Sequence, residues 1–330
     1  MSDTCLFAHY DRFDQLADHV VYYLDALRGA GFAVTVISTA QLGEAERSRL
    51  ASVGADLILR ENSGLDFGSW SAGLAGLRDA EGRLRIDGRL LLANDSVYGP
   101  IGNLSQSLER LLALPGDVHG MVESREIAPH LQSWFLIFSP AAYRNPAFDR
   151  TFAQNFAAMP KDEIIRNGEI SLSINLRAVG LRIAALASDP PHGGIKRLLR
   201  SNPAHFLWRP LIERDGVPFI KVELLRDNPA RVFGLENWPA IVSAKAPGLF
   251  PLINKHLLLH QSELAGLRAR IKKRSISVSA FITRDDVWAR APAVADVCQS
   301  AWVARIDDRV ACPQGVAWLV GKTQERLTRN

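Results

Sequence analysis

The stretch Arg89–Pro100, RLLLANDSVYGP, decides the fold class of this chain. Its apolar run Leu90–Ala93 stops at Asn94-Asp95-Ser96 and a turn signal follows, which predicts a buried parallel strand that delivers a carboxylate to one edge of a sheet. Ligands of open α/β sheets bind outside the carboxyl ends of the strands. An aspartate there, among oxygen-bearing neighbours, suits a hard divalent cation that bridges phosphates.

A second polar stretch, RENSGLDFGSW at Arg60–Trp70, follows another predicted strand. We expect this loop and the loop after Ala93 to face one crevice at neighbouring strand ends. The alternatives are an ordinary turn role for Asp95 and an ordinary tight turn at Gly64, in place of close backbone approach to a phosphate. The spacing matches neither a dinucleotide-binding motif nor a P-loop. The candidate binding residues of the two loops are Arg60, Asn62, Gly64, Asp66, Asn94 and Ser96.

Strands and helices alternate on both sides of these loops. Apolar runs predict strands at Leu6–His9, Phe32–Ser38 and Asp56–Arg60, and apolar residues three and four positions apart predict a helix over Phe13–Leu27. The alternation predicts an α/β domain with a central, mostly parallel sheet flanked by helices. Further helices are expected over 40–53, 69–77, 101–114, 145–158 and 161–179, and further strands over 120–124, 133–138 and 181–186.

The length of 330 residues fits one large domain with an appendage. Periodicity weakens beyond Asp189, a helix is expected again over Pro247–Ile271, and residues 275–330 look like a small module of their own. We therefore expect a first domain over residues 1–245 and a helical or mixed C-terminal extension over residues 246–330.

Charge and cysteine content narrow the class of protein. The net charge of +4 favours anionic partners, but no basic stripe is interleaved with aromatic residues, so we expect no nucleic-acid partner. The three cysteines, Cys5, Cys298 and Cys312, form no CxxC pair, which argues against a disulfide framework or a zinc site and favours the cytoplasm. We expect no signal peptide, and the sequence contains no apolar run of about 20 residues. The basic run Arg268–Arg274 suits either peripheral contact with anionic lipid or a solvated helix end.

Three more titratable residues stand in suggestive places. Glu169 lies in a predicted amphipathic helix, where a single acid is usually a solvated residue, and its spacing pairs it with no base. His130 lies between Pro129 and an aromatic strand, where a lone histidine is more often structural than catalytic. His192, in the loop DPPHGG, is placed to reach a metal or a phosphate.

Together these motifs resemble the rhamnan synthesis protein F family of bacterial polysaccharide glycosyltransferases. The matching segments fall in order over roughly residues 5–235 and are FAHYD (Phe7–Asp11), RENSGLDFGSW (Arg60–Trp70), LLANDSVYGP (Leu91–Pro100), HLQSWFLIF (His130–Phe138), GEISLS (Gly168–Ser173) and HFLWRPLIERDGVPFIKVELLRDNP (His205–Pro229). The family is similar to the inverting GT-A superfamily of nucleotide-sugar transferases, which implies a GT-A-like nucleotide-sugar-binding domain here.

The resemblance implies a role for each matched residue. Asp95 would hold Mg²⁺ or Mn²⁺ against the sugar-nucleotide diphosphate. His192 lies in none of the matched segments and stays the second metal candidate through its own loop alone. Glu169 would be the general base on the acceptor hydroxyl, and His130, which opens HLQSWFLIF, is the other catalytic candidate. The nucleotide pocket would be lined by His9, Asp11 and Arg60. The chain departs from the superfamily in carrying one carboxylate in place of Asp-x-Asp, and one acid at the helix start.

The resemblance thus predicts a metal-assisted, inverting glycosyltransferase of the cell envelope. We expect it to move a deoxysugar, L-rhamnose from dTDP-L-rhamnose, to a growing surface polysaccharide such as lipopolysaccharide O-antigen. The acceptor would be a lipid-linked glycan, and the protein would be cytoplasmic, with peripheral contact at the inner face of the membrane. Trp70, Tyr98 and Trp134 are expected to wall the site. The alternative is a non-catalytic sugar- or nucleotide-binding subunit of a synthesis complex.

Overall fold

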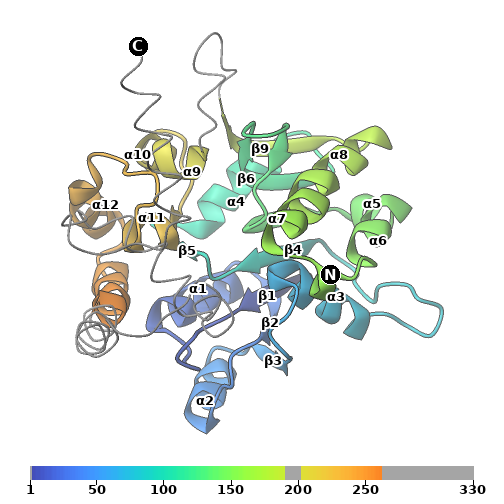
Figure 1. Ribbon diagram of the computed structural model, residues 1–330, viewed down its shortest axis with the longest axis horizontal. Coiled ribbons are helices and arrows are strands. Elements are labelled where there is room, and N and C mark those ends of the chain that lie inside the picture. Colours follow the sequence, from blue (N-terminus) through green and yellow to red (C-terminus); the bar gives the residue numbers. More distant parts are fainter. Residues whose placement is uncertain (1, 190–201, 262–330) are drawn as a thin grey trace, which may run out of the picture. The chain divides into compact units, whose positions relative to one another are not determined.

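A computed structural model describes residues 2–189 and 202–261 of the chain, and Figure 1 shows its ribbon. The strands are β1 (Asp3–His9), β2 (Phe32–Ser38), β3 (Asp56–Leu59), β4 (Leu90–Asn94), β5 (Val97–Tyr98), β6 (Val118–Ser124), β7 (His130–Leu131), β8 (Phe135–Phe138), β9 (Ile183–Ser188) and β10 (Ile220–Lys221). The principal helices are α1 (Asp18–Gly29), α2 (Glu44–Ser52), α3 (Leu65–Gly76), α4 (Leu104–Leu112), α5 (Pro140–Tyr143), α6 (Pro146–Phe152), α7 (Lys161–Ile164), α8 (Ser171–Ala178), α9 (Pro203–Phe206), α10 (Trp208–Glu213), α11 (Val222–Arg226) and α12 (Trp238–Lys245).

The strands of the main sheet follow the order β3-β2-β1-β4-β8-β6-β7, and β9 pairs with β6. β3, β2, β1 and β4 run parallel, β8 runs antiparallel between β4 and β6, and β9 is parallel to β6. The prediction of a mostly parallel central sheet is therefore confirmed. The carboxyl ends of β1, β2, β3, β4, β6 and β9 meet at one edge, which is where ligands of such sheets bind.

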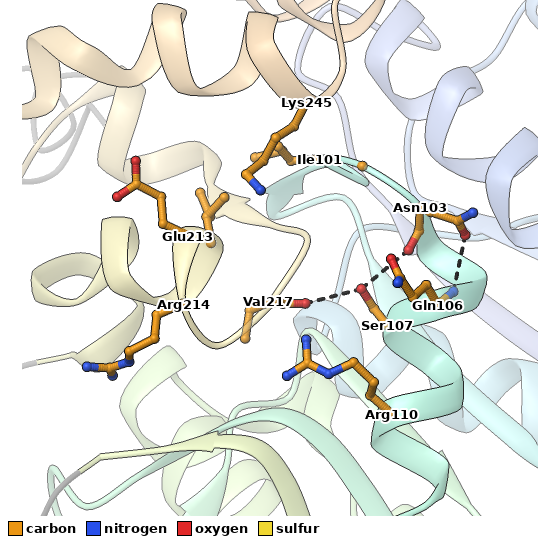
Figure 2. A pocket seen from close by; sticks show the side chains of 12 residues that line it. Ile101, Asn103, Gln106, Ser107, Arg110, Glu213, Arg214, Val217 and Lys245 are labelled. Carbon is orange, nitrogen blue, oxygen red and sulfur yellow. Dashed lines mark hydrogen bonds between the residues drawn. The ribbon is translucent and has the colours of Figure 1, made fainter.

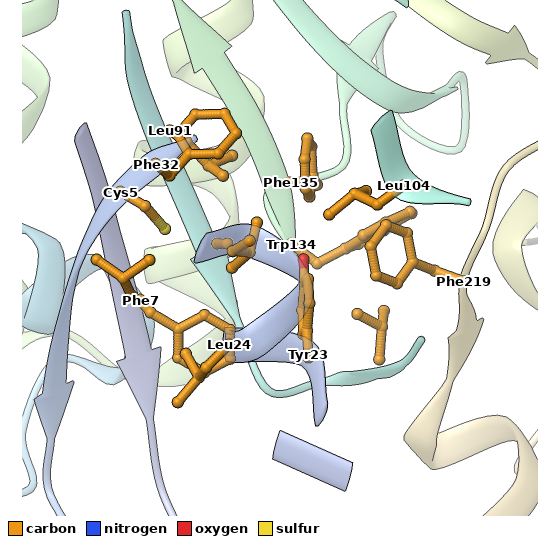
Figure 3. Packing of buried hydrophobic residues seen from close by; sticks show 14 of the residues in the cluster. Cys5, Phe7, Tyr23, Leu24, Phe32, Leu91, Leu104, Trp134, Phe135 and Phe219 are labelled. Atoms are coloured by element: carbon orange, nitrogen blue, oxygen red, sulfur yellow. The ribbon is translucent and has the colours of Figure 1, made fainter. Parts of the chain in front are cut away.

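Helices cover both faces of this sheet, because side chains along each buried strand point alternately to the two sides. Cys5 and Phe7 of β1 face a core that includes Tyr23 and Leu24 of α1 and Leu104 of α4 (Figure 3). The intervening residues of β1 face a second core with helices α3, α6 and α8, formed by side chains that include Leu6, Ala8, Phe67, Trp70, Phe148 and Leu176. The result is a sheet between two helical layers.

A third, smaller core joins the strand pair β5–β10 to the helices that follow it. Tyr98 of β5 packs with Trp208 of α10 and Val242 of α12, and Leu249, Ile253 and Leu257 of the next helical segment complete this cluster. One compact unit of the chain comprises residues 1–226 and 232–258, so it includes this segment. The predicted boundary at residue 245 stays a prediction, since residues 262–330 lie outside the described ranges, as does the basic run 268–274.

Several helices differ from their predicted extents, for local reasons. α1 starts at Asp18, because Asp11 accepts the backbone N–H groups of Phe13 and Gln15 and so shapes a turn before it. The helix predicted over 161–179 is interrupted by the π-helical turn η2 (Ile165–Ile170), which separates α7 from α8. None of the helices in the described ranges combines the length and hydropathy that a bilayer crossing requires.

Candidate functional site

The carboxyl edge of the sheet brings the first predicted residues together. The register pairs His9 with Ser38 and Ala8 with Asn94, so the ends of β1, β2 and β4 lie side by side. β8 pairs Phe135 with Ala93, which places the residues just before β8 at the same edge. The topology alone thus concentrates polar side chains here.

The two polar loops meet, although β2 and β1 separate the strands they follow. Helix α3 runs back so that Asp66, in its first turn, reaches the end of β4, where Asn94 donates from Nδ2 to Asp66 Oδ2 at 2.6 Å. Asn94 Oδ1 in turn accepts from the backbone N–H of Ser96 at 3.1 Å and from its hydroxyl at 2.6 Å. Trp70 Nε1 donates to the carbonyl of Ala93 at 3.2 Å and locks α3 against β4. Asp66, Asn94 and Ser96 therefore form one hydrogen-bonded group.

Asp95 follows this group and is partly exposed. Its Oδ2 accepts the backbone N–H of Tyr10 at 2.8 Å. Burial raises the pKa of Asp95 to about 8, and the negative charges of Asp66 and Asp11 add to the rise, while the bond from Tyr10 opposes it. Burial likewise raises the pKa of Asp66 to about 6, against the bond from Asn94 and the positive charge of Lys221. A nearby cation would therefore stabilise the ionised forms of both carboxyl groups and lower their pKa values.

Glu169 lies in the π-helical turn η2, and its carboxylate is held by two residues from the other side of the site. Oε2 accepts the backbone N–H of Ser133 at 2.7 Å and also the Ser133 hydroxyl. Oε1 lies 3.3 Å from Nε2 of His130. Burial alone would raise the pKa of Glu169, but the hydrogen bonds and charge of His130, with the bonds from Ser133, outweigh it and hold this pKa below its ordinary value.

His130 acts as the cation of this pair. Its Nδ1 lies 2.6 Å from the carbonyl oxygen of Ala128, which can only accept, so Nδ1 carries a proton. Nε2 faces the Glu169 carboxylate, which is also an acceptor, so the ring is an imidazolium while Glu169 is ionised. Burial lowers the pKa of His130, yet Glu169 more than compensates and the pKa lies above its ordinary value. The two predicted catalytic residues are therefore one ion pair.

Lys221 of β10 is a residue of this site that the sequence analysis did not single out. β10 pairs with β5, which begins two residues after Asp95, and Lys221 Nζ donates to Ser96 Oγ at 3.2 Å. Nζ also lies 5.7 Å from the centre of the Trp134 ring. The sequence does carry a feature that could have identified Lys221 as a site residue. It is the single lysine of the matched segment His205–Pro229, and it directly follows an apolar run.

The residues predicted for a nucleotide pocket differ in their surroundings. His9 is buried, its Nδ1 lies 2.9 Å from Ser38 Oγ, and burial lowers its pKa to about 4, so the ring is neutral and ties β1 to β2. Arg60 donates to Ser69 Oγ at 3.2 Å and to Ser63 Oγ at 3.1 Å, so its guanidinium braces its own loop. Asn62 is exposed, and Gly64 has a φ of 72°, a left-handed conformation that favours glycine. Asp11 uses one oxygen for its turn.

The prediction that three aromatic side chains, those of Trp70, Tyr98 and Trp134, line the site is partly wrong. Trp70 and Tyr98 have 0% of their surface exposed and belong to the hydrophobic cores of the fold, so neither lines a site. Trp134 is also buried, at 3% exposed, and packs in the first hydrophobic core, but one face of its ring is turned to Lys221 and its Nε1 donates to Gln132 Oε1 at 3.0 Å, so it borders the site from within the core. Helix packing, which sequence motifs do not report, decided this difference.

The oxygen donors around Asp95 suit a hard divalent cation that shares its ligands with a phosphate. Across residues 2–189 and 202–261, no three histidine, cysteine or acidic side chains come together as metal ligands. Asp66 and Asp11 nevertheless raise the pKa of Asp95, so a cation among them would relieve their repulsion. Mg²⁺ is commonly held by one or two carboxylates together with substrate phosphates. The residues therefore fit such a cation. His192 lies outside the described residues.

A separate cavity of about 310 Å³ is lined by none of these residues. It lies where the first turns of α4 face the loop between α10 and β10, and Figure 2 shows Arg110 and Lys245 on opposite sides of it. Arg214, also on its lining, is already paired with Asp215 at 2.7 Å. This cavity is thus distinct from the carboxylate cluster at the sheet edge.

Comparison with known proteins identifies relatives over most of this fold. The family described as Rhamnan synthesis protein F matches residues 34–245. Virulence protein VirA of Vibrio anguillarum is 34% identical over 197 residues, which cover 52% of this chain and 62% of VirA. The protein y4gN of Sinorhizobium fredii is 27% identical over 175 residues, which cover 52% of this chain and 45% of y4gN. The matches thus span less than two thirds of the length of these curated relatives.

Solved structures overlap with this chain only loosely. A mannosyltransferase from Pyrobaculum calidifontis, solved with GDP-mannose and Mn²⁺, gives a TM-score of 0.38 at 12% identity and covers 93% of this chain and 88% of its own. A glycosyltransferase of Streptococcus pneumoniae gives a TM-score of 0.38 at 11% identity and covers 77% of this chain and 62% of its own. Both TM-scores are below 0.5, so neither superposition says what this chain does.

Proposed function

Because the chain belongs to the rhamnan synthesis protein F family, we propose that it is a glycosyltransferase that builds a bacterial surface polysaccharide. Its donor would be a sugar activated by a nucleoside diphosphate, and its acceptor a hydroxyl of the growing glycan. The observation that carries this proposal is the gathering of Asp66, Asp95, Glu169 and Lys221 at the carboxyl edge of the sheet. A hydroxyl nucleophile requires an acid residue that accepts its proton. A phosphate leaving group requires positive charge nearby, and this edge offers both.

Glu169 is the residue placed to accept the acceptor's proton. Oε2 already receives two hydrogen bonds from Ser133, whereas Oε1 receives one from His130, which leaves a lone pair of Oε1 for a substrate hydroxyl. His130 keeps Glu169 ionised and fixes its orientation. In an inverting displacement, this hydroxyl loses its proton to Glu169 as its oxygen bonds to the anomeric carbon, while the bond from that carbon to the diphosphate breaks.

The departing diphosphate needs positive charge at the other end of the site. Asp95, with Asp66 or Asp11 nearby, would hold a Mg²⁺ or Mn²⁺ ion, which when bound would supply charge to the phosphate oxygens. Around it, Asn94 and Ser96 hold Asp66 and Lys221 in place through direct hydrogen bonds. The fixed polar network lowers the reorganisation that the reaction demands.

The donor and acceptor are proposed from the family alone. We propose that a GT-A-like domain binds dTDP-L-rhamnose and transfers its L-rhamnose with inversion at the anomeric carbon. The acceptor would be a lipid-linked glycan at the inner face of the membrane, as in the synthesis of O-antigen. The fold supports this by presenting one open α/β edge to the donor, as such sheets do for nucleotides.

A second candidate is a subunit that binds a sugar or nucleotide without catalysis. Two observations favour it: three donors already contact the Glu169 carboxylate, and no three metal-ligating side chains gather within residues 2–189 and 202–261. Binding of a sugar nucleotide with neither transfer nor hydrolysis would be its signature.

The test combines donor binding with turnover. A thermal-shift panel of sugar nucleotides, with Mn²⁺ and with a chelator, identifies the donor, since a ligand that binds only the folded state raises the melting temperature. We expect Asp95→Asn to lower donor turnover by about 10²-fold or more with the fold intact, because an amide cannot give up a proton to become a negative ligand when a cation binds, as the Asp95 carboxyl can. Glu169→Gln, in the same assay, should lose turnover but keep donor binding. Transfer by Asp95→Asn at the wild-type rate would refute the assignment.

A further inference from the structure

Lys221 reaches the site from a distant part of the chain. It is the last residue of β10, whose antiparallel pairing sets Lys221 opposite Val97 and Ile220 opposite Tyr98. The backbone N–H of Val222 donates to the carbonyl of Ser96 at 3.0 Å and extends this pairing. The Lys221 backbone is therefore fixed beside Val97, two residues along the chain from Asp95. The third core anchors this strand pair.

The ammonium group of Lys221 has hydrogen-bonding capacity that the fold does not use. An ammonium carries three donors. Within the described residues, one of them serves Ser96 Oγ at 3.2 Å, and one side of the group is covered by the Trp134 ring. The remaining N–H groups have no protein acceptor among these residues.

The charges around Lys221 attract it without pairing with it. Burial lowers the pKa of Lys221, and the positive charge of Lys161 adds to this, while the negative charges of Glu169, Asp66 and Glu223 oppose it. No carboxylate oxygen within the described ranges comes within 4.0 Å of Nζ, so none of these three forms a direct ion pair. Lys221 is half-buried, and keeping even a partly desolvated ammonium without a direct ion-pair partner costs free energy. Since the Lys221 ammonium does not stabilise the fold through an ion pair, its presence here is better explained by an anionic ligand that it binds.

We propose that Lys221 binds the diphosphate of the donor directly and stays on it as the leaving group departs. The inference rests on the proposed function and names a contact of that same site. As the bond between the anomeric carbon and the diphosphate oxygen breaks, the electron pair passes to that oxygen, and the acceptor proton goes to Glu169. Lys221 keeps its own protons throughout and neutralises the new charge by hydrogen bonds.

Inorganic pyrophosphate is the probe, because it carries the diphosphate without a nucleoside or sugar. Isothermal titration of the whole chain, with a chelator and again with Mn²⁺, measures its affinity. We expect Lys221→Met to bind pyrophosphate about 10- to 100-fold more weakly than wild type, since charged hydrogen bonds of this kind are lost. Lys221→Arg should recover part of the affinity. The matched control is Lys245→Met, an exposed lysine of the separate cavity, which should bind as wild type does.

Stability is measured on the same samples, so that a folding defect is recognised. If Lys221→Met melts well below wild type, Lys221→Gln replaces it, because its amide keeps a hydrogen-bond donor at this position without the charge. Pyrophosphate affinity within twofold of wild type in a folded, uncharged variant overturns the inference. If no sugar nucleotide binds or reacts but pyrophosphate still requires Lys221, the proposed function fails while the diphosphate contact stands.

Discussion

Glu169 shows how a single residue acquires a role that its own helix does not reveal. Its helical neighbours offer it no base, yet His130 and Ser133, from the segment before β8, hold both of its oxygens. The histidine is 5% exposed and the glutamate 19%, so solvent screens their attraction little. The pair therefore fixes both the charge and the direction of the predicted base.

This pair predicts how stability depends on pH. The pKa of Glu169 is lowered in the fold, so its contribution is complete above its ordinary pKa of about 4.3 and is lost as the pH falls through the folded value. The pKa of His130 is raised, so its contribution is complete below about 6.5 and is lost as the pH rises through the folded value. We expect Glu169→Gln to lower the free energy of unfolding by about 1–3 kcal/mol, most strongly between roughly pH 4.5 and 6.5.

Urea unfolding of wild type and variant from roughly pH 3.5 to 8.5 measures this difference. The matched control is Glu163→Gln, an exposed acid of the neighbouring helix α7, for which we expect no such maximum. A loss of stability in Glu169→Gln that stays constant across the whole range would show that the ion pair does not form.

At the scale of elements, the position of η2 against α3 sets the distance between the two halves of the site. A Cβ built on Gly168 of η2 would lie 2.9 Å from ring atoms of Phe67, the neighbour of Asp66. The Phe67 ring cannot move freely, because Trp70, Phe152 and Phe156 surround it at centroid distances of 5.1, 5.9 and 5.2 Å. Glycine at 168 thus allows the two elements to approach closely.

We predict that Gly168→Ala is destabilising by about 1–3 kcal/mol, since an added methyl group overpacks a filled core. It should also lower turnover, because the two flanking acids would be pushed apart. Thermal unfolding and the transfer assay measure the two effects. In Gly76→Ala, at the end of α3, a new Cβ meets nothing within 4 Å, so this variant should behave as wild type. Equal stability of the two variants would mean that η2 tolerates a shift away from Phe67.

At the scale of the whole molecule, residues after 245 contribute to the core that anchors β10. Ile253 is 0% exposed and packs in the cluster with Tyr98 and Ile220. The segment that carries it thus supports the strand pair that delivers Lys221. The region predicted as an extension therefore bears on the geometry of the site itself.

Ile253→Ala should lower the free energy of unfolding by about 2–5 kcal/mol, because it leaves a cavity in a packed cluster. Leu258→Ala is the control, since Leu258 is 55% exposed and truncation there removes little buried surface. Chemical denaturation of both variants measures the difference. If Ile253→Ala unfolds as wild type does, the segment after residue 245 is not part of this core.

The local pattern of the chain was sufficient to predict its class and several of its elements. Asn94 and Asp95 were placed correctly at a strand end, because an apolar run followed by polar residues is a property of neighbouring positions. Helix boundaries were less accurate, as at α3, which begins at Leu65, four residues before its predicted start. There the left-handed turn at Gly64, whose carbonyl accepts the backbone N–H of Gly68 at 2.8 Å, sets the helix start, and hydrophobic periodicity does not register such a turn.

By itself, the sequence determined the alternation of strands and helices, the polar loops that end β3 and β4, and membership of the family. Only the tertiary structure decided the strand order, the joining of His130 to Glu169, and the arrival of Lys221 beside Ser96. The physical reason is that periodicity reports which face of one element is buried. Pairing between elements far apart in the chain depends on how all of those faces pack together.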